Sequence, residues 1–482
     1  MKRLSQRLCL AVLMAGGLLS AAAPAPAETI YGAGSTLAAG LFRSWFDCYG
    51  IALNGGKCPV TGVTPTSDLY AYAGVGSGVG IFALLNQTAP TAAPTAPTFV
   101  GSRGIFNPNW LSSAQGVGYP YPRFDFAGSD TTLWDSNINI YNSSAAPTGG
   151  PAIQVPVAGT AVAIAVNNTG LNIVRQPPPH SLRSGFALYL SRESYCGIFT
   201  GNIVDWADAR LKRDNNNTAL VAGAVGSHPI KVIVRNDSSG TTFLLSRHLE
   251  AVCDGTAAAG GFNWGGGVGT TVTWPTLTGS SFTKKDGSGG VASTVASTQF
   301  SIGYVSPDYT KMVTSPVVTP APTVASLQNQ ADVNANPTND PTLATPRAPT
   351  AAATSAGVSA FVVPTVNDAR HWSAAIDGGT VTGSVQIIPT NSTNKMRNPP
   401  ATAASAYPIT GFTMVNFYGC YATATQTSAI TAFVNWYLDT TGTFQNDFLA
   451  GRDGFSTLSS SLKNTIKAYA VTNATTGIKT CS

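Results

Sequence analysis

Charged side chains are scarce in this chain of 482 residues, because Lys, Arg, Asp and Glu together make up only 10% of it. Hydrophobic residues make up 43%, and the formal net charge is only +5. Low hydrophobicity and high net charge are typical of disordered chains, so this composition excludes a wholly disordered protein. The 50 glycines follow no period of three, which excludes collagen. A packed globular protein of two or three domains is expected, at about 100 to 200 residues per domain.

The sequence also lacks an apolar run long enough to cross a membrane as a helix, which needs about 20 residues. The run Leu8 to Leu19 is too short, and no later run reaches 18 residues. Lys2, Arg3 and Arg7 precede the first run, and Ala25 to Ala27 form an A-x-A site after it. This pattern predicts a secretory signal peptide over residues 1–27, and a soluble mature protein that is periplasmic or secreted.

Most of the small positive charge lies in the predicted signal peptide. Residues 1–27 carry three positive charges and no negative ones, so 27 minus three leaves 24 positive charges against 22 negative ones. The mature chain therefore has a net charge of +2. This balance predicts no nucleic-acid partner.

The cysteines and histidines lack the spacing of a metal site. There is no C-x-x-C, and the four His lie apart from the Cys, so we expect no metal and no other cofactor. Cys9 stands at the start of the apolar run, where it would not be lipidated. The six later cysteines predict up to three disulfides in an exported chain. Among 15 possible pairings we favour neighbours in sequence, with Cys48–Cys58 closing a short loop and Cys420–Cys481 holding the C-terminus.

Short apolar runs alternate with helical patterns along the chain, which predicts an α/β fold. The clearest strand patterns are Pro156–Asn167, Ile230–Arg235 and Ser301–Val305, and the clearest helical patterns are Leu37–Tyr49, Thr241–Cys253 and Ser428–Leu438. Residues 88–122 and 315–358 are rich in Pro, Thr and Ala instead. We expect both stretches to be long surface loops or linkers.

Four segments at the ends of predicted strands carry groups that could bind an anion. They are Tyr31–Leu37, Tyr72–Gly80, Phe124–Asp130 and Val234–Phe243. Helix N-termini present free N–H groups and a partial positive charge, and the Arg235 guanidinium matches the geometry of an oxyanion. Each segment also has an ordinary interpretation, as a helix cap, a flexible turn, a turn-forming Asp or an Arg235–Asp237 ion pair.

Taken together, these segments resemble the periplasmic phosphate-binding proteins of phosphate ABC importers (PstS family). The matching runs are Gly32–Thr36, Gly74–Ser77, Gly128–Asp130 and Arg235–Phe243. Supporting runs follow in the same order, at Val155–Val162, Leu190–Ser191, Gly197–Trp206, Ser301–Val305 and Tyr407–Phe412. The similarity spans about residues 29 to 470. The stretches 88–122 and 315–358 depart from the family pattern as inserts.

The resemblance implies a set of phosphate-binding residues, which comprises Thr36, Leu37, Ser77, Asp130, Arg235, Ser239, Gly240 and Thr241. Leu37 stands where the family often has an aromatic residue, but a backbone N–H does not depend on the side chain. Asp130 would accept the proton that phosphate still carries at neutral pH. Sulfate carries no such proton, so the same carboxylate would repel it.

The resemblance also implies a two-lobe periplasmic binding protein fold (type II), with mixed sheets flanked by helices and a hinge between the lobes. The expected divisions are the signal peptide 1–27, a first part of lobe one at 28–155 with the insert 88–122, lobe two at 156–310, a linker or low-complexity insert at 311–360, and a return to lobe one at 361–482.

The implied function is capture of inorganic phosphate for import, with an ABC permease and ATPase complex at the inner membrane as partner. One alternative is a secreted relative of the DING phosphate binders or of phosphatases, and another is a surface interaction protein. No Gly-x-Ser-x-Gly elbow and no paired acid and base are visible. Because tight product binding would slow a hydrolase, we expect a binding protein and not an enzyme.

Overall fold

The computed structural model describes residues 28–49, 69–89, 91, 120–144, 146–174, 188–276, 281–313, 316–340, 343–359, 363–364, 368–377, 380–382, 385–387, 403–441 and 446–482. The predicted signal peptide, Cys58 and most of the insert 88–122 lie outside these ranges. Within them, no helix is both long and apolar enough to cross a membrane.

The first lobe is built on a mixed sheet of five strands. Their spatial order is β2 (Leu69–Gly74), β1 (Thr29–Gly34), β3 (Phe126–Ser129), β13 (Thr410–Tyr418) and β4 (Ala152–Ala161). Strand β1 runs parallel to β2 and β3, whereas β13 runs antiparallel to β3 and β4. Small and aromatic residues fill the central strands, and β3, β4 and β13 are buried along their whole length, as expected of strands covered on both faces.

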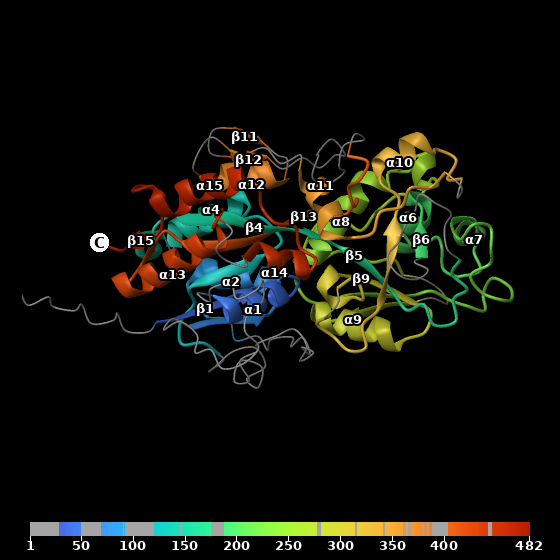
Figure 1. Cartoon of the computed structure of the whole chain (residues 1–482), viewed down its shortest axis with the longest axis horizontal. Helices are drawn as coiled ribbons and strands as arrows, with labels where there is room; N and C mark the ends of the chain where they lie inside the picture. Colours follow the sequence, from blue (N-terminus) through green and yellow to red (C-terminus); the bar gives the residue numbers. More distant parts are fainter. Residues whose placement is uncertain are drawn as a thin grey trace, which may run out of the picture.

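Helices cover both faces of this sheet (Figure 1). They are α1 (Ala39–Cys48), α2 (Ser77–Asn86), α4 (Asp135–Ser144), α11 (Ala351–Val358), α12 (Ala369–Asp377), α13 (Ala424–Tyr437), α14 (Asn446–Arg452) and α15 (Ser460–Lys467). Aromatic rings form much of the interface between sheet and helices. Phe433 of α13, for example, packs on Tyr70 of β2 with ring centroids 5.0 Å apart.

The second lobe has a six-stranded sheet. Its order is β6 (Leu188–Leu190), β10 (Thr323–Leu327), β5 (Ala163–Val166), β9 (Ser301–Val305), β7 (Lys231–Arg235) and β8 (Ser281–Lys285). Strand β7 runs parallel to β8 and β9, and β5 runs antiparallel to β9 and β10. The helices of this lobe are α6 (Arg192–Phe199), α7 (Ala209–Asp214), α8 (Gly240–Val252), α9 (Gly287–Ser297) and α10 (Gln330–Ala335).

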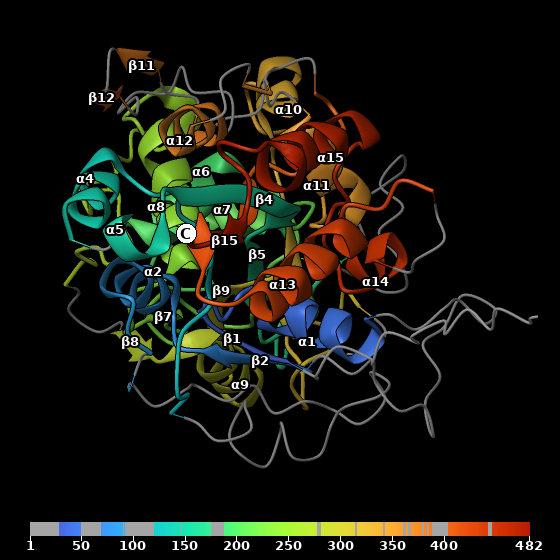
Figure 2. The same cartoon turned by 90° about the vertical axis from the view of Figure 1, so that its left-hand side faces the viewer.

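The chain passes between the lobes at Val162, the residue between the end of β4 and the start of β5. Figure 1 shows the lobes side by side with β4 and β5 running across the middle, and Figure 2 views the molecule from the side of the first lobe. The chain returns through α11, which packs on β4 and β13 of the first sheet. At the crossing, the Tyr407 hydroxyl donates to the Val162 carbonyl at 3.0 Å.

The predicted strands and helices are confirmed, and so is the two-lobe α/β architecture with mixed sheets. The run Pro156–Asn167 contains the end of β4 and all of β5, and Ser301–Val305 coincides with β9. The expected lobe boundary at residue 156 falls inside β4, which pairs with β13 as far as Ala161. Because the pairing of β4 with β13 is a long-range contact, a local pattern could not locate the crossing.

The expectation of a linker over residues 311–360 is wrong for the described part. This stretch contains β10, which pairs with β5 and β6 inside the second sheet, followed by α10 and α11. Its prolines lie outside these elements, as Pro320 and Pro322 do before β10. The prediction is wrong because it rests on the composition of the whole stretch, in which the five-residue strand Thr323–Leu327 is flanked by residues typical of loops.

The two disulfides whose cysteines both lie in the described ranges join neighbours in the order of the cysteines. Cys196 of α6 pairs with Cys253 at the end of α8, and Cys420 of β14 (Cys420–Tyr421) pairs with Cys481. The predicted Cys420–Cys481 pair is therefore confirmed, and it lies beside β15 (Lys479–Thr480), which pairs with β14. The predicted partner of Cys48 is outside the described residues.

Replacing both Cys196 and Cys253 by Ser should lower the free energy of unfolding by about 2–4 kcal/mol, because the cross-link restricts the unfolded chain. Urea unfolding followed by tryptophan fluorescence measures the loss. The matched double variant is Cys420→Ser with Cys481→Ser. The Cys420–Cys481 disulfide closes a loop with a separation of 61 residues, against 57 for Cys196–Cys253, so its removal should lower the free energy of unfolding by a similar amount. An unchanged unfolding midpoint in both double variants would contradict this account.

Candidate anion-binding site

Four helix starts meet where the lobes face each other. Helices α1 and α2 follow the parallel strands β1 and β2 of the first lobe, and α8 and α9 follow the parallel strands β7 and β8 of the second. The carboxyl ends of parallel strands lie at one edge of a sheet, which is where α/β proteins bind ligands. Each start adds backbone N–H groups and a partial positive charge, so the meeting point favours an anion.

All eight residues that the resemblance implied lie buried in this region. Among them, Asp130 is 2% exposed and Arg235 is 4% exposed, and the other six are buried as well. They form two groups of contacts. One group surrounds the Arg235 guanidinium, and the other surrounds the Asp130 carboxylate.

The guanidinium of Arg235 reaches from the second lobe to the first. Its Nη2 donates to Thr36 Oγ1 at 2.9 Å, and its Nη1 donates to Thr241 Oγ1 at 3.2 Å. Its Nε donates to Asp237 Oδ1 at 2.7 Å, and Nη2 also donates to Asp237 Oδ2. The Arg235–Asp237 ion pair therefore exists, and it leaves the guanidinium aimed at the first lobe.

Electrostatics keep this pair ionised. Burial alone would lower the pKa of Arg235, but the Asp237 carboxylate outweighs burial and the pKa is raised. Burial alone would raise the pKa of Asp237, but Arg235 outweighs it and that pKa is lowered. A permanent cation, largely balanced by its own carboxylate, therefore lies at the junction of the lobes.

The Asp130 carboxylate accepts hydrogen bonds from hydroxyl groups of its own lobe. Ser35 Oγ donates to Oδ2 at 2.5 Å, Ser77 Oγ donates to the same oxygen at 3.4 Å, and Thr413 Oγ1 donates to Oδ1. Burial raises the pKa of Asp130 to about 6, although the bonds from Ser35 and Thr413 act in the opposite direction. Asp130 is therefore a proton acceptor that is mostly ionised at neutral pH.

Gly240, the first residue of α8, brings the second lobe against Asp130. A Cβ at this position would stand 2.7 Å from Asp130 Oδ2 and 2.4 Å from Ser77 Oγ. No real side chain fits at such distances. The absence of a side chain at Gly240 is what lets the start of α8 approach the carboxylate of the other lobe.

Leu37 and Ser239 already have hydrogen-bond partners at the starts of α1 and α8. The Leu37 N–H donates to Ser35 Oγ at 3.1 Å, and Ser239 Oγ accepts from the Thr242 N–H at 3.1 Å. The Ser239 N–H donates to the Thr270 carbonyl at 2.9 Å. The ordinary interpretation as a helix cap is therefore correct for Ser239, the N-cap of α8, whereas the N-cap of α1 is Ala38, which makes no side-chain cap bond.

Sequence reasoning missed three residues of the site: Ser35, Ser288 and Thr413. Ser288, at the start of α9, accepts from Arg235 Nη1 at 3.3 Å, and its N–H donates to Thr36 Oγ1 at 3.2 Å. A signal was available, because the Gly-rich run Asp286–Gly290 follows the strand Ser281–Lys285 and opens a helix, as in the other segments. Thr413 offers no local signal, since only the pairing of Met414 with Ser129 brings β13 to Asp130.

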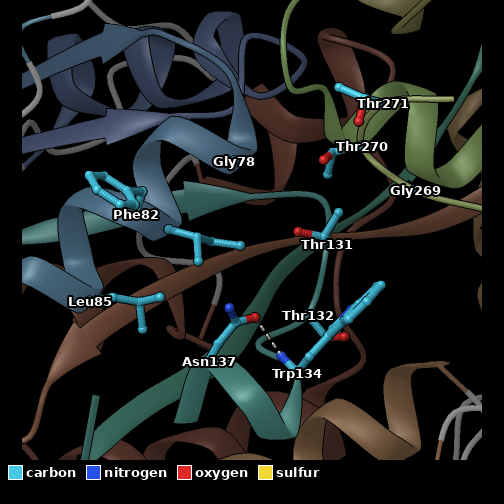
Figure 3. A pocket seen from close by; sticks show the side chains of 11 residues that line it. Gly78, Phe82, Leu85, Thr131, Thr132, Trp134, Asn137, Gly269, Thr270 and Thr271 are labelled. Carbon is cyan, nitrogen blue, oxygen red and sulfur yellow. Dashed lines mark hydrogen bonds between the residues drawn. The ribbon is translucent and has the colours of Figure 1, made fainter. Parts of the chain in front are cut away.

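A cavity of about 360 Å³ adjoins these residues (Figure 3). Its walls include Gly78 and Phe82 of α2, Thr131 and Trp134 after β3, and Thr270 of the second lobe. None of the described residues that line it is charged. Gly78 also touches the second lobe, because its N–H donates to the Ser238 carbonyl at 3.3 Å and a Cβ there would stand 1.9 Å from Ser238 Oγ. The cavity is thus the uncharged outer part of the space between the lobes.

Comparison with known proteins agrees with this architecture. A family model described as the PBP superfamily domain matches residues 20–441. The chain belongs to the PBP superfamily. The expected resemblance to periplasmic binding proteins is therefore confirmed. In this chain, the candidate site lies in the buried polar junction between the two lobes.

Individual relatives carry two kinds of name. The chain is 28% identical over 415 residues to alkaline phosphatase L of Pseudomonas aeruginosa (strain UCBPP-PA14), and this match covers 85% of this chain and 84% of the relative. It is also 28% identical over 420 residues to a phosphate-binding protein from an unknown prokaryotic organism, covering 84% and 89%. Among solved structures, a high affinity periplasmic phosphate-binding protein (PfluDING) bound with phosphate matches with a TM-score of 0.60, 26% identity and coverage of 93% and 96%.

The raised pKa of Asp130 predicts a specific dependence of stability on pH. Because the folded chain holds a proton up to about pH 6 that the unfolded chain releases near pH 4, the stability from this group is complete below about pH 4 and is lost as the pH rises through 6. Relative to Asp130→Asn, the wild type should lose about 2 kcal/mol of unfolding free energy between pH 4 and pH 7. Urea unfolding of both phosphate-free proteins across this range measures it. A constant difference between them would contradict the raised pKa.

Proposed function

We propose that this PBP superfamily protein captures inorganic phosphate between its lobes for import by an ABC-type permease and ATPase complex. The observation that carries the proposal is the junction of four helix starts, the Arg235 guanidinium and the Asp130 carboxylate in one buried region. The relatives named as phosphate-binding proteins support it. Closure would follow bending at the crossing near Val162, as in hinged two-lobe binding proteins.

The chemistry of the junction suits a tetrahedral oxyanion. Since Asp237 balances most of the charge of Arg235, an incoming anion would be held mainly by hydrogen bonds and helix dipoles. We assign donor roles to the hydroxyl groups of Thr36, Ser77 and Thr241, to the guanidinium of Arg235 and to the N–H of Gly240. Leu37 and Ser239 would join them by exchanging their present hydrogen bonds for bonds to the anion.

Asp130 would provide selectivity. Near neutral pH its carboxylate is mostly ionised and can accept the proton of hydrogen phosphate. Sulfate has no proton to donate, and two negative charges about 4 Å apart repel each other by about 4 kcal/mol at an effective dielectric constant near 20. Hydrogen phosphate offsets this repulsion by donating its proton in a hydrogen bond to the carboxylate, whereas sulfate cannot, so the two anions of the same shape should bind with different free energies.

Phosphate should therefore bind the wild type about 100- to 1000-fold more tightly than sulfate at pH 7. Asp130→Asn should narrow this ratio by at least about tenfold, because an amide can donate to sulfate. Titration calorimetry measures both. Asp214→Asn is the matched control, since Asp214 is another buried carboxyl with a pKa raised by burial to about 6. Asp214 accepts from the N–H of Ser191, the N-cap residue of α6, and it lies outside the junction. Equal affinity of the wild type for the two anions would overturn the role of Asp130.

Arg235→Ala should weaken phosphate binding by about 100-fold or more, because it removes a buried charged donor and leaves Asp237 unpaired. Arg235→Lys keeps the charge but loses the planar fork, so an intermediate affinity is expected. Arg192→Ala, which removes a buried Arg that bonds Gln330, controls for lost packing. Circular dichroism verifies folding in each case. Full phosphate affinity in a folded Arg235→Ala variant would contradict the proposal.

Export supports the same role. A signal peptide over residues 1–27 would direct the mature chain to the periplasm or to secretion, where a binding protein meets its ligand before import. The importer partner rests on the PstS resemblance. Genes for a permease and an ATPase beside the gene of this protein would favour transport, whereas secretion genes would favour a secreted or surface role.

Hydrolysis of phosphate esters is the second candidate function, because a relative over 85% of the chain is named alkaline phosphatase L. We favour binding over hydrolysis, since a site that holds phosphate tightly would retain its own product. An assay with p-nitrophenyl phosphate separates the two functions. Turnover by the wild type that Arg235→Ala abolishes would favour the enzyme.

A further inference from the structure

Two side chains of the second lobe bond to the backbone of the turn before α1. The Tyr309 hydroxyl donates to the Thr36 carbonyl at 2.9 Å, and the Ser306 hydroxyl donates to the Leu37 carbonyl at 3.1 Å. Both bonds cross between the lobes. They involve the carbonyl oxygens of the turn, whereas the groups assigned to the anion are its hydroxyl and N–H groups.

Tyr309 is held firmly in the second lobe. It ends the short helix η3 (Pro307–Tyr309) just after β9, and it is fully buried. It belongs to a core cluster that includes Ile233 of β7 and Val291 of α9. The position of its hydroxyl is therefore set by the second lobe, so this hydroxyl approaches Thr36 only when the lobes meet.

The turn itself belongs to the first lobe, and three consecutive carbonyl groups in it accept a side-chain hydroxyl. Ser35 accepts from Tyr72 of its own lobe at 3.0 Å, and Thr36 and Leu37 accept from Tyr309 and Ser306. A trans peptide holds its C=O and its N–H on opposite sides. Fixing the Thr36 carbonyl toward Tyr309 therefore directs the Leu37 N–H away from it, toward Ser35 Oγ, which also bonds Asp130.

We infer that Tyr309, assisted by Ser306, is a positioning residue that couples lobe closure to the orientation of the anion-binding turn. In the open protein, water hydrates the Thr36 and Leu37 carbonyls, so the Tyr309 and Ser306 hydroxyl groups do not contribute to the stability of that form. On closure the hydroxyl groups replace that water, fix the peptide planes and present the donors of the turn to the anion. The inference rests on the proposed phosphate function and adds a residue that does not touch the ligand.

The test compares two Tyr→Phe variants that each remove one buried hydroxyl bonded to a backbone carbonyl. Tyr309→Phe removes the bond between the lobes, whereas the control Tyr70→Phe removes the bond from Tyr70 to the Ala429 carbonyl at 2.8 Å, within the first lobe. Tyr309→Phe should weaken phosphate binding by about 5- to 30-fold, since closure then buries the Thr36 carbonyl without a donor. Most of the change should appear as faster phosphate release in stopped-flow fluorescence.

Thermal unfolding with and without phosphate supplies the readout that a purely structural role would not move. Tyr309→Phe should unfold like the wild type without phosphate and at a lower temperature with saturating phosphate. Tyr70→Phe should lose the same stability in both conditions and keep wild-type affinity. Ser306→Ala should show the same pattern as Tyr309→Phe but a smaller effect, because the Ser306 hydroxyl is shared with the Asp308 carboxylate.

Wild-type affinity in Tyr309→Phe, or an equal loss of stability with and without phosphate, would overturn the inference while leaving the proposed function intact. Failure of the wild type to bind phosphate in calorimetry would instead overturn the proposed function, and the inference with it. The two failures are distinguished by the wild-type titration alone.

Discussion

The guanidinium of Arg235 is the group on which the junction of the lobes depends. It is buried in the second lobe, and it bonds across to Thr36 of the first lobe and back to Asp237 of its own. A buried cation is stable only with a charged partner and satisfied donors. Asp237, Thr36, Thr241 and Ser288 meet that requirement together, so the starts of α1, α8 and α9 must meet around it.

The scarcity of charge in the sequence fits the way this junction is built. Most of its contacts come from hydroxyl groups, backbone N–H groups and the glycine at position 240, and the charge of Arg235 is largely offset before any ligand arrives. Hydrogen bonds are directional and short-ranged, so such a site discriminates by shape and protonation more than by net charge. Asp130 adds a buried carboxylate, which under the proposed function would favour an anion that still carries a proton. The uncharged cavity beside Gly78 continues this character outward.

Local patterns located much of the site because its residues lie at strand ends that open helices. Thr36, Ser77, Arg235 and Thr241 were all identified from such segments, and the structure gathers them. The same reasoning failed where composition was averaged over a long window. The composition of residues 311–360 predicts a linker, yet Thr323–Leu327 is an inner strand of the second sheet. The prolines around it stop neighbouring elements without disrupting the strand itself.

The sequence alone determined the α/β class, the strands, the helix starts and the identity of the groups that could bind an anion, because each depends on spacing within about ten residues. The two lobes were implied by the resemblance to the PstS family. Only the tertiary structure decided which groups meet. Thr413 reaches Asp130 through strand pairing, and Tyr309 reaches the Thr36 carbonyl across the two lobes. The physical reason is that these contacts join residues more than 250 positions apart, 283 in one case and 273 in the other, and no local pattern records a partner so distant.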